Sequence, residues 1–453
     1  MKQPLDYLQN FKNHAWLIGD DSQEFYQIAT ELYFQLIELS KKAIPPKIIL
    51  AEREPVRFLA SFIAACAAKC PVFLCNPDWG KNEWEQVFNL VQPDIVWGLE
   101  TGDWGLGTGN NNLSAISNSI MIPTGGSSGK IKFAIHTWET LTASVQGFIE
   151  YFQLNAVNSF CVLPLYHVSG LMQFMRSFIT GGKLVITSFK EIESQRIPNI
   201  NHSDFCISLV PTQLQKLLQK PELTTWLSQF ETVLLGGAPA WEELLEKARF
   251  HHIRLAPTYG MTETASQIVT LKPDDFLNGK NNSGQILPHA QVTIDNLTGN
   301  ILIKAKSLAL GYYPQLWENP NNFLVDDIGF LDAEGYLHII GRSSNKIISG
   351  GENIYPIEVE SAIRKTNLII DVCVIGIPDK HWGQALTAIY IPKNPNTSIL
   401  EIETHLKDKL SKFKIPKHWI SLPNLPRNAQ GKINHPELQK IAEDFLAHSS
   451  HNS

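Results

Sequence analysis

Short apolar runs alternate with amphipathic stretches from about residue 45 to residue 270. The apolar runs are Lys47–Ala51, Val72–Cys75, Phe160–Leu163, Lys183–Thr187, Phe205–Leu209 and Thr232–Leu235. Strand-like runs that alternate with helical patterns are typical of proteins in which helices cover a largely parallel sheet. We therefore predict an α/β fold with doubly wound, mostly parallel sheets over this part of the chain.

The pattern changes after about residue 290. Strands separated by turn residues predict a smaller β-rich region at 292–313, and a strand–turn–strand follows at 329–340. The remaining pattern predicts helices at 356–365 and 399–410, with strands near 371–377 and 385–391 between them. A tail of this size can fold as a unit. We expect a large N-terminal domain over 1–342 and a small α+β domain over 343–453.

Composition narrows the class of protein. The 453 residues exceed one ordinary domain, and the net charge of −6 comes from interspersed charges that do not favour nucleic acid as a partner. The six cysteines are sparse and mostly lie in apolar runs, as reduced cysteines do in a cytosolic protein. The N-terminus lacks a secretory signal, and the longest apolar run, near Phe58–Ala68, is too short to cross a bilayer. We expect a cytoplasmic protein without a membrane span.

Residues 123–132 read Pro-Thr-Gly-Gly-Ser-Ser-Gly-Lys-Ile-Lys and follow an apolar run. Glycines let backbone N–H groups converge on an anion, while hydroxyl and ammonium groups add donors and charge. The loop therefore predicts a phosphate-binding site, although its spacing does not fit the Walker loop. For the loop taken alone, a Gly/Ser-rich linker is the alternative.

Three later segments suit a nucleotide. Tyr259–Thr264 offers an aromatic ring for a purine and a carboxylate for Mg²⁺, or it is a turn before a helix capped by Thr262. Leu235–Pro239 has small residues against which a ring can lie, or it is an ordinary strand-to-helix turn. Asp327 and Arg342 suit the hydroxyls of a ribose, or they form a surface ion pair.

Two segments nearer the C-terminus complete the set. The double glycine in Ser349–Asn353 leaves room for the thiol arm of a ligand, or it belongs to a simple loop. Lys432 ends the turn-rich segment Pro426–Lys432, where a lysine taken alone is usually solvated.

Taken together, these segments resemble the acyl-adenylate-forming superfamily of acyl-CoA synthetases, luciferases and peptide-synthetase adenylation domains. The resemblance runs from about Ile120 to Ile433, some two-thirds of the chain. Within the superfamily, residues 163–171, 259–271 and 347–360 are most similar to the branch of 2-succinylbenzoate–CoA ligases of menaquinone and phylloquinone biosynthesis. The resemblance implies an AMP-forming acid–thiol ligase with a mobile C-terminal domain, acting on a small carboxylic acid with ATP, Mg²⁺ and coenzyme A.

The resemblance also implies a role for each motif residue. The β- and γ-phosphates of ATP would lie on Thr124, Gly125, Gly126, Ser127, Ser128, Gly129 and Lys130. The adenosine would contact Gly236, Gly237, Ala238 and Tyr259, with its ribose on Asp327 and Arg342. Thr262 would contact the α-phosphate, Glu263 would hold Mg²⁺, and Lys432 would enter the site for adenylation only. Ser344 falls at the hinge, and Gly350 and Gly351 would flank the pantetheine path.

Some positions depart from the family pattern. In the phosphate loop Gly125 stands for a serine, Ile131 for a proline and Phe133 for a glycine, while Ser344 replaces the more usual Asp or Lys of the hinge. Backbone N–H groups can still bind phosphate without the lost hydroxyl. Every residue expected to carry charge chemistry is present, so we predict an active enzyme.

The acid pocket is less defined by sequence. His167, Ser169 and Gln267 lie in segments that match the ligase branch and can hydrogen-bond a second carboxylate or a ketone. Arg176 is a candidate cation for a dicarboxylate; alternatively His167 is structural and Arg176 a surface group. Three other functions stay open: a synthetase for another aryl or acyl acid, an adenylation module that loads a carrier protein, and a non-catalytic nucleotide-binding protein. The sequence leaves the oligomeric state undefined.

Overall fold

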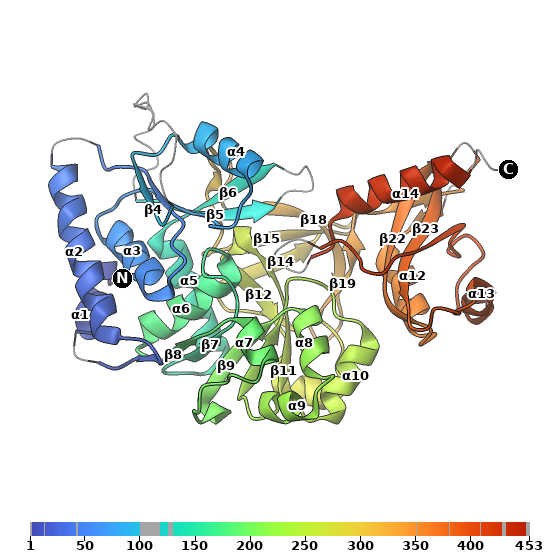
Figure 1. Ribbon diagram of the computed structural model, residues 1–453, viewed down its shortest axis with the longest axis horizontal. Helices are drawn as coiled ribbons and strands as arrows, with labels where there is room; N and C mark the ends of the chain where they lie inside the picture. Colours follow the sequence, from blue (N-terminus) through green and yellow to red (C-terminus); the bar gives the residue numbers. More distant parts are fainter. Residues whose placement is uncertain are drawn as a thin grey trace.

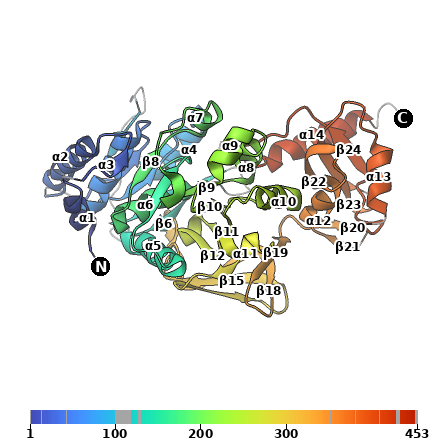
Figure 2. The same ribbon diagram turned by 90° about the horizontal axis from the view of Figure 1, so that it is seen from below.

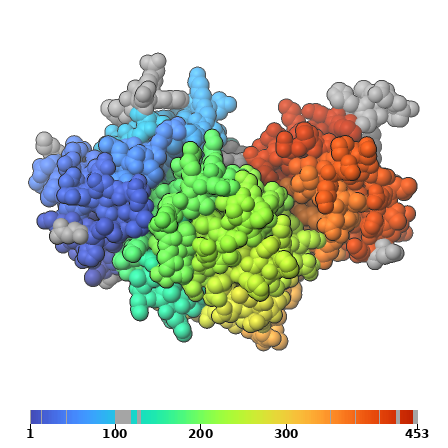
Figure 3. All heavy atoms as spheres, turned by 60° about the horizontal axis from the view of Figure 1, so that its bottom comes forward, coloured from blue at the N-terminus to red at the C-terminus, as the bar shows by residue number. Residues whose placement is uncertain are grey.

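The computed structural model describes residues 2–12, 14–41, 44–99, 118–125, 130–350, 352–379, 381–407, 409–427 and 432–449. These residues form a large lobe, up to Arg342, and a small lobe, from Ile347 onward, that lies at one end of the molecule (Figure 1). In the space-filling view the small lobe, orange to red, borders the green part of the large lobe (Figure 3). None of the helices in the described ranges has the length and apolar character needed to pass through a bilayer.

The first sheet of the large lobe has seven strands within the described residues. Their order is β4 (Ile95–Trp97), β2 (Ile48–Leu50), β3 (Val72–Leu74), β5 (Ile120–Gly125), β6 (Ile131–His136), β16 (Gly311–Tyr312) and β17 (Gln315–Leu316). Strands β4 to β5 run parallel, whereas β6 returns antiparallel to β5. Of the segment predicted to bind phosphate, Gly125 therefore ends β5 and Lys130 precedes β6 in a pair of antiparallel strands.

The second sheet has eight strands in the described part of the chain. Their order is β1 (Leu17–Ile18), β8 (Leu184–Ile186), β7 (Asn158–Cys161), β9 (Phe205–Leu209), β10 (Thr232–Leu235), β11 (Leu255–Met261), β12 (Ser266–Thr270) and β13 (Gln285–Ile286). Strands β1 to β11 are parallel, and β12 and β13 are antiparallel. The predicted α/β class with mostly parallel, helix-covered sheets is confirmed, with the strands divided between two sheets.

Helices cover both sheets, and two of them pack between the sheets. The helices of the large lobe are α1 (Pro4–Asn10), α2 (Ser22–Ser40), α3 (Pro55–Ala67), α4 (Lys81–Val91), α5 (Trp138–Phe152), α6 (Val168–Thr180), α7 (Phe189–Glu193), α8 (Pro211–Leu217), α9 (Pro221–Leu227), α10 (Glu242–Phe250) and α11 (Pro273–Leu277). One core cluster joins Leu74 of the first sheet and Leu184 of the second to Val145 of α5 and Phe174 of α6. Since α5 and α6 touch both sheets, they fix the position of one sheet relative to the other.

The predicted β-rich region at 292–313 and the strand–turn–strand after it contribute to one antiparallel sheet, except that β16 at the end of the region joins the first sheet. The strands of this antiparallel sheet are β14 (Ala290–Ile294), β15 (Asn300–Ala305), β18 (Phe323–Leu331) and β19 (Leu337–Arg342). The predicted turn between the last two is confirmed, since the Asp332 carboxylate accepts the N–H groups of Glu334 and Tyr336. This sheet carries Asp327 and Arg342 toward the small lobe.

The small lobe is an α+β unit whose two apolar cores use only residues from Ile347 onward. It contains β20 (Ile347–Ser349), β21 (Glu352–Ile354), α12 (Pro356–Arg364), β22 (Ile369–Asp379), β23 (Gly383–Pro392), α13 (Ile399–Lys407), β24 (His418–Ser421) and α14 (His435–Ser449). The two predicted strands and the helix at 356–365 are confirmed, and α13 is shorter than the predicted 399–410. The division into domains at residues 342 and 343 stays a prediction.

The six cysteines are all buried and free. Burial raises the pKa of the Cys70 thiol to about 11 and that of the Cys206 thiol to about 11. These side chains therefore serve as small apolar residues of the core, as predicted from their positions in apolar runs.

Candidate active site

The turn that joins β11 to β12 is fixed through its four consecutive carbonyl groups, those of residues 262–265. The donors are His136 Nε2 to Thr262 (2.8 Å), the Ala309 N–H to Glu263 (2.8 Å), Ser307 Oγ to Thr264 (2.8 Å) and Ser144 Oγ to Ala265 (2.7 Å). A carbonyl oxygen only accepts, so His136 carries its proton on Nε2. The alternative of a helix capped by Thr262 is wrong, because a short 3₁₀ turn leads directly into β12.

Glu263 presents its carboxylate from this turn and is only 7% exposed. Its Oε1 accepts a hydrogen bond from the Tyr312 hydroxyl (2.6 Å) and a longer one from Thr124 Oγ1 (3.5 Å). Oε2 has no hydrogen bond among the described residues, and no group of three potential metal ligands occurs there. Magnesium is usually bound by one or two carboxylates together with substrate phosphates, so Glu263 fits this ion in the presence of a nucleotide.

Tyr259, Asp327 and Arg342 form one hydrogen-bonded group. Asp327 and Arg342 are directly paired between β18 and β19, and Arg342 Nε donates to Asp327 Oδ1 at 2.9 Å. The Tyr259 hydroxyl donates to the other oxygen, Oδ2, at 2.8 Å. Burial and then the negative charge of Asp327 raise the pKa of Tyr259, so its hydroxyl stays protonated. A carboxylate has about four acceptor positions, which leaves room on Asp327 for the hydroxyls of a ribose.

Lys432 reaches the same place from the small lobe. Its side chain keeps contact with solvent but is crowded by protein atoms, and its pKa is lowered by desolvation first and by Arg342 second. The charges of Glu263 and Asp327 act in the opposite direction, which places Lys432 in the electrostatic field of both carboxylates. Desolvation and the charge of Lys432 lower the pKa of His167 to about 4. In the present orientation of the lobes, the charges of Glu263, Asp327 and Arg342 therefore all act on the Lys432 ammonium.

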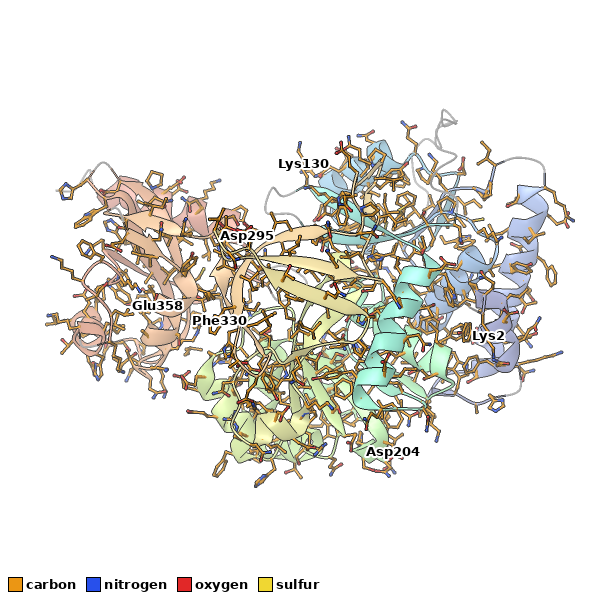
Figure 4. The ribbon with its side chains drawn as sticks, turned by 180° about the vertical axis from the view of Figure 1, so that it is seen from behind. Lys2, Lys130, Asp204, Asp295, Phe330 and Glu358 are labelled. Carbon is orange, nitrogen blue, oxygen red and sulfur yellow. The ribbon has the colours of Figure 1, made fainter. Side chains whose placement is uncertain are left out.

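The phosphate-loop residues are described only in part. Thr124 and Gly125 end β5, and Lys130 is exposed just before β6 on the large lobe (Figure 4). Gly126, Ser127, Ser128 and Gly129 lie outside the described residues. Lys132 Nζ is 5.3 Å from the centre of the Tyr312 ring, and Tyr312 contacts Glu263. Thr124 of β5 therefore contacts the Glu263 carboxylate directly, and Lys132 of β6 lies against the tyrosine that contacts it.

The segment Gly236–Ala238 follows β10 and packs beside β11. Gly237 has φ of +82°, which a glycine adopts without strain, and a Cβ on Gly236 would lie 2.7 Å from Thr258 Oγ1. Thr258 immediately precedes Tyr259, so this segment lies next to the predicted adenine-binding ring. The helix predicted to start near Pro239 begins instead at Glu242.

Ser344, the residue predicted to lie at the hinge, is held by a neighbour of Asp327. The Ser344 N–H donates to Asp326 Oδ1 at 3.1 Å, and the Ser344 hydroxyl donates to Asp326 Oδ2. Further along, Gly350 adopts φ of +59° and its N–H donates to the Trp382 carbonyl at 2.9 Å. Gly351 lies outside the described residues.

Of the residues predicted for the acid, His167, Ser169 and Arg176 lie on α6 or at its N-cap, whereas Gln267 lies on β12. His167 is the N-cap residue, and Ser169, Gln173 and Arg176 follow at the spacing that places side chains on one helical face. Gln173 donates to the Ser169 carbonyl at 2.9 Å. Arg176 is 3% exposed, so its interpretation as a surface group is wrong.

Arg176 is held without an anion. Its Nη2 donates to Gln267 Oε1 at 2.7 Å and to Ser266 Oγ at 3.3 Å, and its guanidinium lies 4.4 Å from the centre of the Phe148 ring. Within the described ranges Arg176 forms no ion pair, and its Nε and Gln267 Nε2 lack hydrogen-bond partners. Burial lowers the pKa of Arg176 to about 10, so it remains a cation at neutral pH.

Sequence reasoning missed several residues of this site. His136, Tyr312, Ser266 and Asp326 were not predicted, although each contacts a predicted residue. His136 gives a weak signal, as a polar residue that ends the apolar run of β6. Tyr312 gives none, because its contact with Glu263 spans 49 residues of sequence.

Family profiles match two parts of the chain: the AMP-binding enzyme family at residues 108–313 and the AMP-binding enzyme C-terminal domain at residues 358–432. The chain belongs to this family of AMP-binding enzymes. A 2-succinylbenzoate–CoA ligase of Oceanobacillus iheyensis is 37% identical over 61% of the chain and 60% of its own length. The Listeria monocytogenes serovar 1/2a enzyme of the same name is 37% identical over 71% of the chain and 69% of its length.

Solved structures of similar proteins cover nearly the whole chain. An o-succinylbenzoate CoA synthetase of Bacillus subtilis, in complex with its acyl-adenylate intermediate, has a TM-score of 0.80 at 25% identity and covers 97% of this chain and 98% of its own. ATP-bound MatB of Rhodopseudomonas palustris also has a TM-score of 0.80, at 20% identity, covering 98% of this chain and 100% of its own. The second likeness concerns the fold alone.

Proposed function

We propose that this chain is an AMP-forming acid–thiol ligase that joins 2-succinylbenzoate to coenzyme A, a step of menaquinone and phylloquinone biosynthesis. The observation that carries the proposal is that Lys432 of the small lobe lies in the electrostatic field of Glu263, Asp327 and Arg342 of the large lobe. The relatives named as 2-succinylbenzoate–CoA ligases and the fold shared with an o-succinylbenzoate CoA synthetase support this activity.

In the first half-reaction a carboxylate oxygen of the acid attacks the α-phosphorus of ATP, and pyrophosphate leaves. The transition state gathers negative charge on the phosphoryl oxygens, which the Lys432 ammonium and the Thr262 hydroxyl can stabilise. Glu263 is the residue that would hold Mg²⁺, which supplies Lewis-acid stabilisation of the same oxygens. The fixed carbonyls of residues 262–265 keep Thr262 and Glu263 in place, so little reorganisation accompanies the reaction.

In the second half-reaction the sulfur of coenzyme A attacks the acyl carbon, and AMP leaves. Lys432 and the thiol require the same face of the acyl-adenylate at different times. Rotation of the small lobe about Ser344 would remove Lys432 and bring Gly350 and Gly351 to the path of the thiol. The ribose would stay on Asp327, with Tyr259 and Gly236–Ala238 against the adenine throughout.

The acid would lie along α6. A 2-succinylbenzoate molecule keeps a second carboxylate after the first is activated, and a buried guanidinium without an anion is costly unless a ligand supplies one. Positions 167 and 176 of a helix are about 13 Å apart, which suits an acid with one end near Lys432 and the other on Arg176. Ser169 and Gln267 would add hydrogen bonds to the ketone and the second carboxylate.

The test is pyrophosphate release with ATP, Mg²⁺ and 2-succinylbenzoate, with and without coenzyme A, followed by mass analysis. We expect acid-dependent pyrophosphate and the mass of 2-succinylbenzoyl-CoA. Turnover with benzoates or fatty acids but not with this acid would contradict the substrate and keep the mechanism. Transfer to a phosphopantetheinylated carrier protein in preference to coenzyme A would contradict the acceptor, and no pyrophosphate with any acid would contradict the enzyme class.

A further inference from the structure

The two lobes also touch far from the hinge in sequence, where the first turn of α10 meets the end of α12. Lys365, which follows the last residue of α12, forms an ion pair with Glu242, the first residue of α10. The guanidinium of Arg364 lies 5.5 Å from the centre of the Trp241 ring. The two helices are neighbours in the view from below (Figure 2). We call these four residues the inter-lobe contact.

The inter-lobe contact is complementary in charge. The hydrogen bond that Lys365 donates to Glu242 raises the pKa of Lys365 against a smaller effect of desolvation, and the charges of Glu242, Glu243 and Glu246 raise it further. The N-terminus of α10 carries a positive partial charge and the C-terminus of α12 carries a negative one. The two helix ends that face each other therefore also attract. Charges and dipoles therefore both favour this placement of α12.

Arg364 is fixed within the small lobe, so the contact has a defined geometry. Its Nη2 donates to the Val372 carbonyl at 2.7 Å and lies 3.3 Å from Asp371 Oδ1, and Nη1 lies 3.7 Å from a Glu360 oxygen. With three of its own lobe's groups holding the guanidinium, only one orientation of the small lobe sets it against Trp241. Trp241 in turn follows Gly236–Ala238 by three residues, which links the contact to the nucleotide site.

From these contacts we propose that Trp241, Glu242, Arg364 and Lys365 are positioning residues for the first half-reaction. They hold the small lobe in the orientation that places Lys432 beside Glu263 and Asp327, and they separate before the thiol enters. The proposal rests on the proposed function, and these residues touch neither substrate nor reacting atoms. They act by favouring one of two lobe orientations, and therefore through Lys432.

Charge reversal separates this role from a general effect on folding. In Glu242→Lys or Lys365→Glu the contact becomes repulsive, and acid-dependent exchange of pyrophosphate into ATP should fall about three- to tenfold, since exposed ion pairs are individually weak. Thioester formation from supplied 2-succinylbenzoyl adenylate and coenzyme A should stay within about twofold of wild type, since that step requires the contact to open. The double variant Glu242→Lys/Lys365→Glu re-forms the ion pair and should restore part of the exchange, because Glu243, Glu246 and the two helix dipoles still oppose a glutamate at position 365.

Glu334→Lys is the matched control. It reverses one charge of the exposed Lys280–Glu334 ion pair, which lies entirely within the large lobe. We expect both half-reactions to keep the wild-type rate. Equal losses in both half-reactions for Glu242→Lys, or no rescue in the double variant, would overturn the proposal.

A measurement of lobe orientation tests the contact without turnover. Leu297 and Leu400 are 96% and 67% exposed, one on each lobe, and the six native cysteines are buried, so the two positions can be changed to cysteine and labelled for energy transfer. With ATP and Mg²⁺, Glu242→Lys should reduce the wild-type distance population, and the double variant should restore part of it. Unchanged distances in the single variant would overturn the proposed role of the inter-lobe contact, even if the wild-type enzyme is active. A wild type without acid-dependent exchange would contradict only the proposed function.

Discussion

At the scale of single residues, Lys432 is the side chain on which the two half-reactions should differ most. Its ammonium lies in the field of Glu263 and Asp327 in the present orientation. Lys432→Ala should slow adenylation about 10²–10³-fold, the effect of removing one transition-state donor. Thioester formation from supplied adenylate should largely survive, which rapid-quench assays of each step will measure. An equal loss in both steps would contradict the role.

Arg176 carries the prediction on acid recognition. Arg176→Met keeps the volume but removes the buried charge that pairs with no anion in the described part of the chain. Because a buried unpaired charge is costly, we expect a melting temperature equal to or above that of wild type. KM for 2-succinylbenzoate should rise about 100-fold, as for loss of a charged hydrogen-bonded contact of roughly 2–3 kcal/mol.

The same variant supplies its own control through the substrate. Wild type and Arg176→Met should turn over an analogue that lacks the second carboxylate at similar rates. A parallel loss with both acids would assign Arg176 to the structure of the pocket and contradict recognition of the second charge.

At the scale of elements, β6 positions the catalytic turn through His136. This histidine is fully buried, and its pKa is lowered to about 4 by desolvation, against the hydrogen bond to the Thr262 carbonyl. In the unfolded chain the pKa of a histidine is about 6.5. As the pH falls, His136 is therefore protonated in the unfolded state before it is protonated in the folded state. The contribution of His136 to the free energy of unfolding is therefore fully present above about pH 6.5. Between about pH 6.5 and pH 4 the free energy of unfolding falls by up to about 3 kcal/mol on its account.

His136→Gln should therefore lose less free energy of unfolding than wild type between pH 7 and pH 4.5. The glutamine amide still offers a donor for the Thr262 carbonyl. Urea unfolding at both pH values measures the change in free energy of unfolding. His252→Gln, at an exposed position, is the matched control and should keep the wild-type pH dependence. An unchanged dependence in His136→Gln would contradict the assignment.

The elements also show which parts of the fold can be predicted from local sequence. The helix expected at 356–365 is found at Pro356–Arg364, because a proline at its first turn and an amphipathic pattern are local signals. The division of strands between two sheets was not predicted, since the choice of pairing partner depends on crossovers far apart in sequence. In the candidate site, sequence motifs single out charged residues such as Glu263 and Asp327. His136 belongs to no such motif, because its contact with Thr262 joins positions that are 126 residues apart.

At the scale of the whole molecule, the proposed function requires two orientations of the small lobe, and Asp326 contacts the segment between the lobes. It accepts the N–H and the hydroxyl of Ser344 from the strand that also carries Asp327. A residue on the sheet thus fixes the residue whose backbone angles would change in the proposed rotation of the lobe. Both side chains are exposed, so the bonds are strong enough to bias the orientation and weak enough to break.

Ser344→Ala removes the hydroxyl bond and should favour departure from the adenylation orientation. We expect adenylation to slow about two- to fivefold, as for loss of a hydrogen bond of roughly 0.5–1 kcal/mol, with thioester formation unchanged or faster. Thr298→Ala is the matched control, because its hydroxyl donates to Asp295 at 2.8 Å in a turn of the large lobe. In a double-mutant cycle, Asp326→Ala should add little to Ser344→Ala, since both remove the same contact. Fully additive effects would mean that the two residues act separately, and the hinge would then be set by the backbone rather than by this pair.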